Sequence, residues 1–227
     1  MIGVFDSGVG GLSAIKELKR LSPSVDICFL ADKEHAPYGT KTEDELTELV
    51  YSDIKRLMIS GADTVLMACC SASTVFQNLP ISMREIAYPI IHPAAKRAAE
   101  VTTDGRIGVI ATERTVASHA FSRELSEMNG VKDVIELSAQ PLVSLIESGV
   151  TDARMTRRVR DEIYEIIKPI KKEGIDTLIL GCTHFPHVLR TVSGMLPGVR
   201  LISPSREGAL QILSKTSPQG RGELILI

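Results

Sequence analysis

Residues 61–69 read Gly-Ala-Asp-Thr-Val-Leu-Met-Ala-Cys, and residues 174–182 read Gly-Ile-Asp-Thr-Leu-Ile-Leu-Gly-Cys. Each stretch runs from a glycine through a short apolar, β-branched segment to a cysteine, which is the pattern of a buried strand. A second pair recurs at a similar separation, because residues 2–6 (Ile-Gly-Val-Phe-Asp) resemble residues 107–111 (Ile-Gly-Val-Ile-Ala). Buried strands also resemble one another by chance, but the shared Gly-x-Asp-Thr and the closing cysteine favour two similar halves.

Short apolar runs of this kind alternate with longer segments of helical period along the whole chain, which is typical of a parallel α/β protein. The expected strands are 2–6, 26–31, 63–68, 88–91, 107–111, 133–137, 176–181 and 199–203. We predict an α/β fold of two pseudo-symmetric lobes, each a mostly parallel sheet flanked by helices, with the active site in the cleft between them. The predicted first lobe contains residues 1–92 and 201–227, and the second contains residues 93–200.

Three helices have clear signals. Residues 42–60 begin with Thr42 three positions before Glu45, which is a capping-box pattern, and then carry an apolar stripe. Residues 115–129 and 151–168 have similar periodicity, and we expect Gly130 to end the former and Pro169 to limit the latter.

The composition and net charge indicate which kind of molecule the protein binds. Apolar residues make up 44% of the 227-residue chain, charged residues 24%, and the formal net charge is −2. A near-neutral chain lacks the concentrated basic face that nucleic acids and anionic membranes require, so we expect a small-molecule ligand. The sequence shows neither a signal peptide nor an apolar run of about 20 residues, which predicts a cytoplasmic protein. The four cysteines are therefore expected to be reduced thiols.

Cys69 and Cys182 occupy equivalent places in the two repeats. In open α/β sheets, ligands bind beyond the carboxyl ends of the strands, so facing lobes would each contribute one thiol to a shared cleft. Such an arrangement suits inversion of a stereocentre, because one group removes a proton from one face while another returns a proton to the opposite face. Since a free cysteine is also a common core residue, the pairing rather than either thiol alone carries the prediction.

The segments around the two cysteines contain further groups that could take part in the chemistry. Residues 68–73 pass from a strand into a helix, so we expect the helix N-terminus to lower the pKa of Cys69 below about 8.5. Residues 181–187 contain Cys182, His184 and His187, which favours a proton relay between Cys182 and His184; a zinc site is the alternative.

A third segment, the glycine-rich stretch at residues 6–11, opens a helix and could meet a carboxylate or phosphate with its backbone N–H groups. It matches the dinucleotide-binding fingerprint poorly, and its glycines could also serve tight packing alone.

These motifs resemble the cofactor-independent glutamate racemases over nearly the whole chain. The matching segments are Asp6–Gly11, Pro37–Gly39, Ala68–Cys69, Gly108–Thr112 with Thr115, Pro141–Gly149 and Leu180–Pro186. The resemblance implies two α/β lobes around a central site, no cofactor, no metal, and a cytoplasmic supply of D-glutamate for cell-wall peptidoglycan. It also allows a homodimer.

Carried over by position, the resemblance assigns a role to individual residues. Cys69, assisted by Asp6, would remove the α-proton of the D-amino acid, and Cys182 that of the L-amino acid. His184, supported by Glu147, would assist Cys182. The expected substrate-binding residues are Ser7, Pro37, Tyr38, Gly39, Cys70, Ser71, Thr112, Thr115 and Thr183.

The chain departs from the family pattern at three places. Cys70 stands where an asparagine is usual, Gln140 where a cysteine is common, and residues 203–205 lack an expected aspartate. A hydrogen bond to a charged group contributes about 1.5–3 kcal/mol. The binding free energy lost without an amide at position 70 is therefore large enough to change the preferred substrate. The alternatives to a glutamate racemase are a racemase for aspartate or another amino acid, and an amino-acid-binding relative without turnover.

Overall fold

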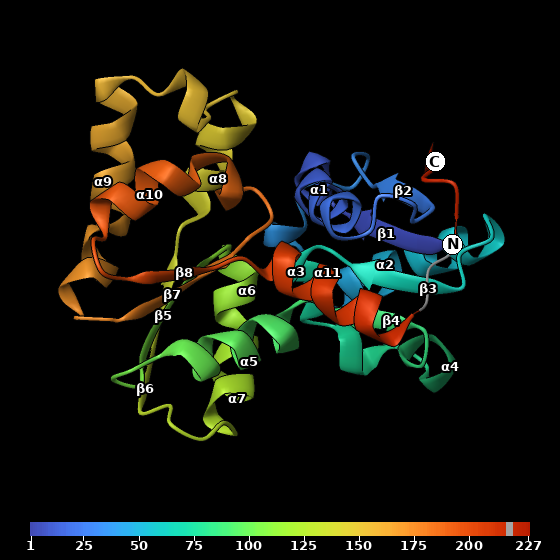
Figure 1. The fold of residues 1–227 in the computed structure, drawn as a ribbon, viewed down its shortest axis with the longest axis horizontal. Helices are drawn as coiled ribbons and strands as arrows, with labels where there is room; N and C mark the ends of the chain where they lie inside the picture. Colours follow the sequence, from blue (N-terminus) through green and yellow to red (C-terminus); the bar gives the residue numbers. More distant parts are fainter. Residues whose placement is uncertain (217–219) are drawn as a thin grey trace.

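Two parallel sheets form the framework of the protein in this computed structural model, which describes residues 1–216 and 220–227 (Figure 1). The first sheet has the strand order β4-β3-β1-β2-β9, and the second β6-β5-β7-β8. The bounds of the first are β1 (Ile2–Asp6), β2 (Ile27–Ala31), β3 (Thr64–Met67), β4 (Ala87–Pro89) and β9 (Leu224–Leu226). Those of the second are β5 (Arg106–Ala111), β6 (Asp133–Ser138), β7 (Thr177–Gly181) and β8 (Arg200–Ile202).

The two sheets repeat one strand order. β4-β3-β1-β2 corresponds position by position to β8-β7-β5-β6, and every pairing is parallel. β3 and β7 are thus equivalent strands; Cys182 directly follows β7, and Cys69 lies two residues after the end of β3. The predicted α/β fold of two pseudo-symmetric lobes is confirmed. In residues 1–216 and 220–227, β9 has no counterpart in the second sheet, and the sequence did not predict it.

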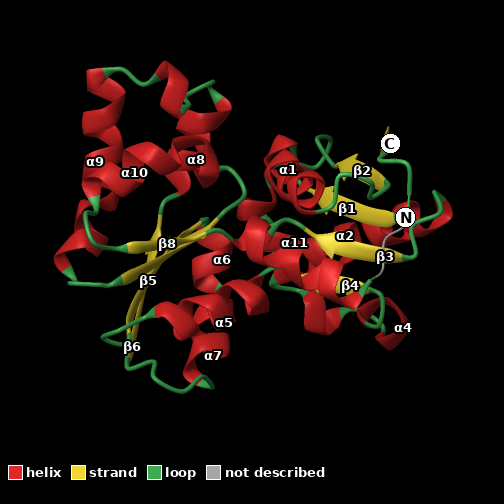
Figure 2. Cartoon of the chain, in the orientation of Figure 1, coloured by secondary structure: helices red, strands yellow, loops and turns green. Residues whose placement is uncertain are grey.

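Helices cover both faces of each sheet (Figure 2). Their bounds are α1 (Leu12–Leu21), α2 (Glu43–Ile59), α3 (Cys70–Ser73), α4 (Ile81–Arg84), α5 (Ile91–Val101), α6 (Glu113–Ala117), α7 (Ala120–Ser126), α8 (Gln140–Glu147), α9 (Arg157–Lys172), α10 (Leu189–Met195) and α11 (Pro204–Lys215). Short 3-10 turns lie at Val9–Gly11, Tyr38–Thr40, Phe76–Asn78, Asp152–Arg154 and Phe185–Val188. Among the described residues, we find no helix with the length and apolar character needed to cross a bilayer.

A continuous apolar core joins the two lobes. It contains side chains of α1, α5 and α11 together with residues of both sheets, such as Leu66 in β3 and Ile107 in β5. Two further cores lie on the outer faces of the sheets, one under α2 and one under α8, α9 and α10. The shared core fixes the sheets relative to each other, with α5 and α11 lying between them (Figure 1). The exact residue limits of the two lobes stay a prediction.

The predicted capping box of α2 is confirmed. The Thr42 hydroxyl accepts from the Glu45 backbone N–H at 3.3 Å, and the Glu45 carboxylate accepts from the Thr42 N–H at 2.9 Å. Both interactions satisfy backbone donors that a helix start leaves free. The helix covers residues 43–59, close to the expected 42–60.

Two other helix predictions are wrong in detail. Residues 115–129 do not form one helix, because His119 adopts a left-handed conformation (φ 50°) between α6 and α7, and α7 ends at Ser126, before Gly130. α9 begins at Arg157 rather than residue 151 and continues through Pro169 to Lys172. Burial of an isoleucine stripe on α9 against the second sheet outweighs the hydrogen bond that a helical proline removes.

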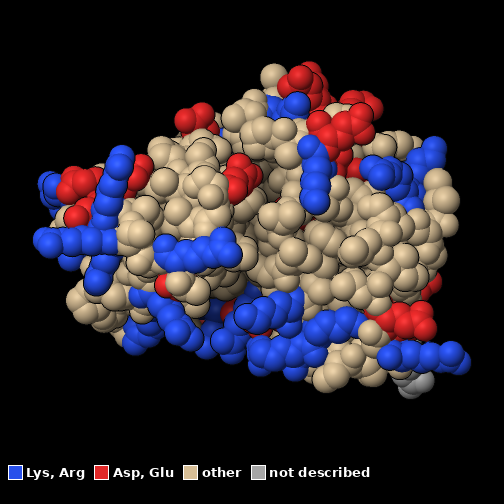
Figure 3. All heavy atoms as spheres, turned by 90° about the horizontal axis from the view of Figure 1, so that it is seen from above, with Lys and Arg blue, Asp and Glu red and all other residues tan. Residues whose placement is uncertain are grey.

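The surface carries mixed charge, with basic and acidic side chains interspersed on the face in Figure 3 and a basic run along one edge. The absence of a nucleic-acid or membrane partner stays a prediction.

Candidate active site

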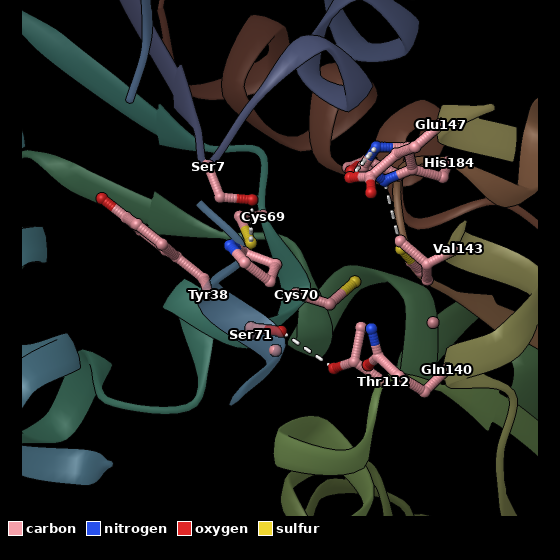
Figure 4. Close-up of a pocket in the computed structure, with 15 residues that line it drawn as sticks. Ser7, Tyr38, Cys69, Cys70, Ser71, Thr112, Gln140, Val143, Glu147 and His184 are labelled. Atoms are coloured by element: carbon pink, nitrogen blue, oxygen red, sulfur yellow. Dashed lines mark hydrogen bonds and ion pairs between the residues drawn. The ribbon is translucent and has the colours of Figure 1, made fainter. Parts of the chain in front are cut away.

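A pocket lies between the lobes, beyond the carboxyl ends of the strands (Figure 4). Twelve of the predicted site residues line it: Ser7, Pro37, Tyr38, Gly39, Cys69, Cys70, Ser71, Thr112, Glu147, Cys182, Thr183 and His184. Asp6 and Thr115 are fully buried and lie behind this lining. Gln140, Val143 and Gly181 also line the cavity, and they were not among the predicted site residues.

Cys69 reaches the cavity from the first lobe. It follows β3, precedes α3 and is 6% exposed, and its Sγ donates to the Ser7 hydroxyl at 3.9 Å. Burial, followed by the negative charge of Asp6, raises the pKa of the Cys69 thiol to about 12. The expectation of a lowered pKa is therefore wrong, because the four-residue helix α3 offers less stabilisation of a thiolate than burial removes.

Cys182 enters from the second lobe with a histidine beside it. Its Sγ lies 3.5 Å from His184 Nδ1, and His184 Nε2 lies 3.5 Å from the Glu147 carboxylate. Burial lowers the pKa of His184, which favours the neutral imidazole. Because the Glu147 carboxylate only accepts, it favours hydrogen on Nε2 and leaves Nδ1 free to accept from the thiol.

The thiols of both lobes share one electrostatic environment. Burial is the main reason for the raised pKa of Cys182, and the charges of Cys69 and Asp6 raise it further. Burial also raises the pKa of Cys70, followed by the charges of Cys182 and Cys69. Each thiolate therefore disfavours the others, and ionisation of one thiol at a time is favoured.

Asp6 links the lobes beneath the cavity floor. Its carboxylate accepts from Thr183 Oγ1 and from the Gly8 backbone N–H, each at 3.0 Å. Burial raises the pKa of Asp6, whereas nearby His184 lowers it. The carboxylate makes no hydrogen bond to Cys69 in the described residues, so it acts on that thiol through its charge.

Three hydroxyl groups form one wall. Ser71 Oγ lies 2.9 Å from Thr112 Oγ1 and 3.3 Å from Thr115 Oγ1, while Thr112 donates to Thr115 at 3.0 Å. Thr115 therefore supports the two hydroxyls that line the cavity. Ser71 belongs to the first lobe and Thr112 to the second, so this cluster also joins the lobes.

The Tyr38 hydroxyl points away from the cavity (Figure 4). It donates to Asp32 at 2.5 Å and lies 2.7 Å from an Asp53 oxygen, and all three side chains are buried. A substrate contact of Tyr38 would therefore come from its backbone. One hydroxyl hydrogen cannot satisfy two carboxylates, and burial raises the pKa of Asp53 to about 6.

The raised pKa of Asp53 predicts a pH-dependent stability. A carboxyl group whose pKa is higher in the folded than in the unfolded protein, here about 6 against about 4, lowers the free energy of unfolding as pH rises between these values. Above pH 6 the full loss is about 3 kcal/mol. Asp53→Asn removes this cost and keeps a neutral amide within hydrogen-bond distance of the Tyr38 hydroxyl. We expect thermal unfolding to give a higher Tm for the variant above pH 6 and similar values near pH 4. Parallel curves of Tm against pH for the two proteins would contradict the raised pKa of Asp53.

The zinc alternative has no matching ligand cluster, since no group of three or more His, Cys, Asp or Glu side chains suited to a metal occurs in residues 1–216 and 220–227.

Comparison with known proteins places the chain in a family. The family model for Asp/Glu/hydantoin racemases matches residues 13–212. A glutamate racemase of Desulforudis audaxviator (strain MP104C) is 36% identical over 232 residues, covering 98% of this chain and 84% of that protein.

Solved structures agree as well. A glutamate racemase isoform from Bacillus anthracis superposes with a TM-score of 0.90 at 30% identity, covering 100% of this chain and 86% of that one. The glutamate racemase of Francisella tularensis in complex with D-glutamate gives a TM-score of 0.86 at 26% identity, covering 99% and 86%. The chain therefore belongs to the Asp/Glu/hydantoin racemase family, and within it to the glutamate racemases.

Proposed function

We propose that this protein interconverts L- and D-glutamate by moving the α-proton between the thiols of Cys69 and Cys182. The observation that carries the proposal is the convergence of these two thiols, from equivalent strands of separate lobes, on one cavity. Relatives named glutamate racemase, one of them solved with D-glutamate, support glutamate as the substrate.

The reaction starts from one thiolate and one thiol. From the L-side, His184 Nδ1 takes the proton of Cys182, and the thiolate removes the α-proton. Cys69 then protonates the opposite face of the carbanion. From the D-side the two cysteines exchange roles, so the Cys69 thiolate removes the α-proton and the Cys182 thiol protonates the opposite face. Together with burial, the negative charge of Asp6 raises the pKa of Cys69, which makes its thiolate a stronger base. The ammonium group of the substrate brings positive charge beside both thiols, which offsets the burial that raises their pKa.

Hydrogen-bond donors hold the substrate. Among the described residues that line the cavity, none is Lys or Arg, so neutral groups must bind both carboxylates. Ser7 supplies a hydroxyl and Gly39 its backbone N–H, whereas the hydroxyls of Ser71, Thr112 and Thr183, which bond other protein groups in this structure, would have to turn toward the substrate to donate to it. A substrate that fills the pocket between the lobes would also exclude water from the carbanion, which strengthens each hydrogen bond.

The direct test is incubation with L-glutamate or L-aspartate in deuterated water, following circular dichroism and the α-proton NMR signal. We expect glutamate to lose both signals, and aspartate, one methylene shorter, to react about 10- to 200-fold more slowly. Faster exchange of aspartate would identify an aspartate racemase. Tight binding without exchange of either would replace the proposal with an amino-acid-binding role, which the thiol of Cys70 in place of an amide makes the second candidate.

The proposal extends to location and assembly. Two catalytic thiols require a reducing compartment, so we place the enzyme in the cytoplasm, where it would supply D-glutamate for peptidoglycan. The homodimer stays a prediction that sedimentation analysis can check.

A further inference from the structure

Gln140 is a cavity-lining residue whose side-chain amide lies at the boundary between the lobes. It is the first residue of α8, in the second lobe, and its Oε1 accepts from the Glu113 backbone N–H at 3.4 Å. Across the lobe boundary, a Cβ on Gly39 would lie 3.0 Å from this oxygen, so the two residues are in tight contact. The amide is therefore confined between Gly39 and the start of α6.

The hydrogen-bond partner decides which end of the amide enters the cavity. Turning the group by half a turn would place its NH2 against the Glu113 N–H, bringing two donors together. Oε1 must therefore face Glu113, and Nε2 faces the cavity (Figure 4). Within the described part of the chain, Nε2 donates to no protein acceptor, so both its hydrogens are free for a ligand.

The cavity has an acidic side and a neutral donor side. Glu147 lies beside His184 at one end, whereas Gln140 and Thr112 lie together at the other (Figure 4). An ammonium group is attracted to the acidic side and a carboxylate to the donor side. The Thr112 and Ser71 hydroxyls already bond each other, so the Gln140 amide has the free hydrogens that a carboxylate needs.

We propose that Gln140 is a substrate-binding residue that donates from Nε2 to a carboxylate of the amino acid. The inference rests on the proposed racemase function and assigns to this position the amide that Cys70, a weak donor lining the same cavity, lacks. One hydrogen bond to a charged group corresponds to about a 10- to 100-fold change in affinity.

Gln140→Glu is the sharpest variant, because it keeps the size of the side chain and an oxygen that accepts from Glu113. The variant loses the NH2 donor and gains a negative charge, and both changes oppose binding of a carboxylate; Gln140→Ala removes the donor without adding the charge. We expect kcat/KM for glutamate to fall at least about 10- to 100-fold, mainly through KM, with Tm unchanged. The matched control is Gln77→Glu, at a surface glutamine whose oxygen accepts from Arg84, which should leave the kinetics unchanged. Wild-type KM in Gln140→Glu, or a fall in kcat alone, overturns the assignment.

A second pair of variants tests the amide itself. Gln140→Ala should show a similar rise in KM, and adding Cys70→Asn should recover at least about tenfold, because an amide then enters from the opposite lobe. Absence of any recovery, together with a normal KM in Gln140→Glu, gives Gln140 a packing role only.

Two competitive inhibitors identify which carboxylate is bound. 2-Aminobutyrate keeps the α-carboxylate, and 4-aminobutyrate keeps the distal one. The inhibition constant that rises in Gln140→Glu identifies the carboxylate in contact; unchanged constants for both contradict the inference. If the wild-type protein racemises nothing, the proposed function fails, and calorimetric D-glutamate affinities of wild type and variant still decide the role of Gln140.

Discussion

Replacing either Cys69 or Cys182 with serine is expected to reduce glutamate racemisation by about 10²- to 10⁴-fold. A hydroxyl is far less acidic than a thiol, so serine neither forms the base on one face nor exchanges roles efficiently on the other. Both side chains are 6% exposed and serine is slightly smaller, so the fold should be retained. Coupled assays in both directions, with circular dichroism spectra of the variants, measure the effect.

The control for this prediction is the cysteine outside the cavity. Cys28 is fully buried in the core beneath the first sheet and does not line the site. Cys28→Ala should lower stability through a small cavity and leave kcat/KM within about threefold of wild type. Near-normal turnover in Cys69→Ser or Cys182→Ser would remove the two-thiol mechanism.

Gly10→Ala is expected to reduce kcat/KM by about 100-fold. A Cβ at position 10 would overlap Thr183 Oγ1, lie 2.9 Å from Thr183 Cβ and approach His184 Cε1 at 3.1 Å. The displaced Thr183 would lose its bond to Asp6, and His184 would shift from Cys182. Displacements near 1 Å at a reacting centre reduce rates by about this factor.

Gly8→Ala provides the matched control in the same loop. A Cβ at Gly8 meets nothing within 4 Å, its φ of −170° is extended, and it does not line the cavity. We expect activity close to wild type. Equal loss in both variants would mean that the loop needs backbone freedom rather than close approach to Thr183.

The sequence predicts the fold well where the chain is buried and repetitive. Parallel strands covered on both faces read as apolar runs, so the duplicated segments ending at Cys69 and Cys182 identify the sheets and the shared site. β9 is not predicted because its three residues are exposed and pair with β2, a strand far away in the sequence. The helix break at His119 is not predicted because the apolar periodicity continues across it, and periodicity carries no information on the backbone angle φ.

The site is predictable where motifs are dense and unpredictable where burial decides. Cys182 and His184 belong to one recognisable cluster, whereas Gln140 stands alone at a helix start, and Val143 reads as an ordinary core residue. The helix start after Cys69 is visible in the sequence, but the depth of burial that raises the pKa of its thiol is not. The sequence also does not show which way a side chain points: the Tyr38 hydroxyl points away from the cavity, toward Asp32.

The opposed placement of the two thiols is tested most directly by α-proton exchange in the single-cysteine variants. Cys69→Ser and Cys182→Ser are each incubated in deuterated water with pure L- or pure D-glutamate, and deuterium incorporation is measured by NMR. We expect Cys69→Ser to exchange L-glutamate only and Cys182→Ser to exchange D-glutamate only, both without inversion. Exchange of the same enantiomer by both variants would place the thiols on one face and contradict the mechanism.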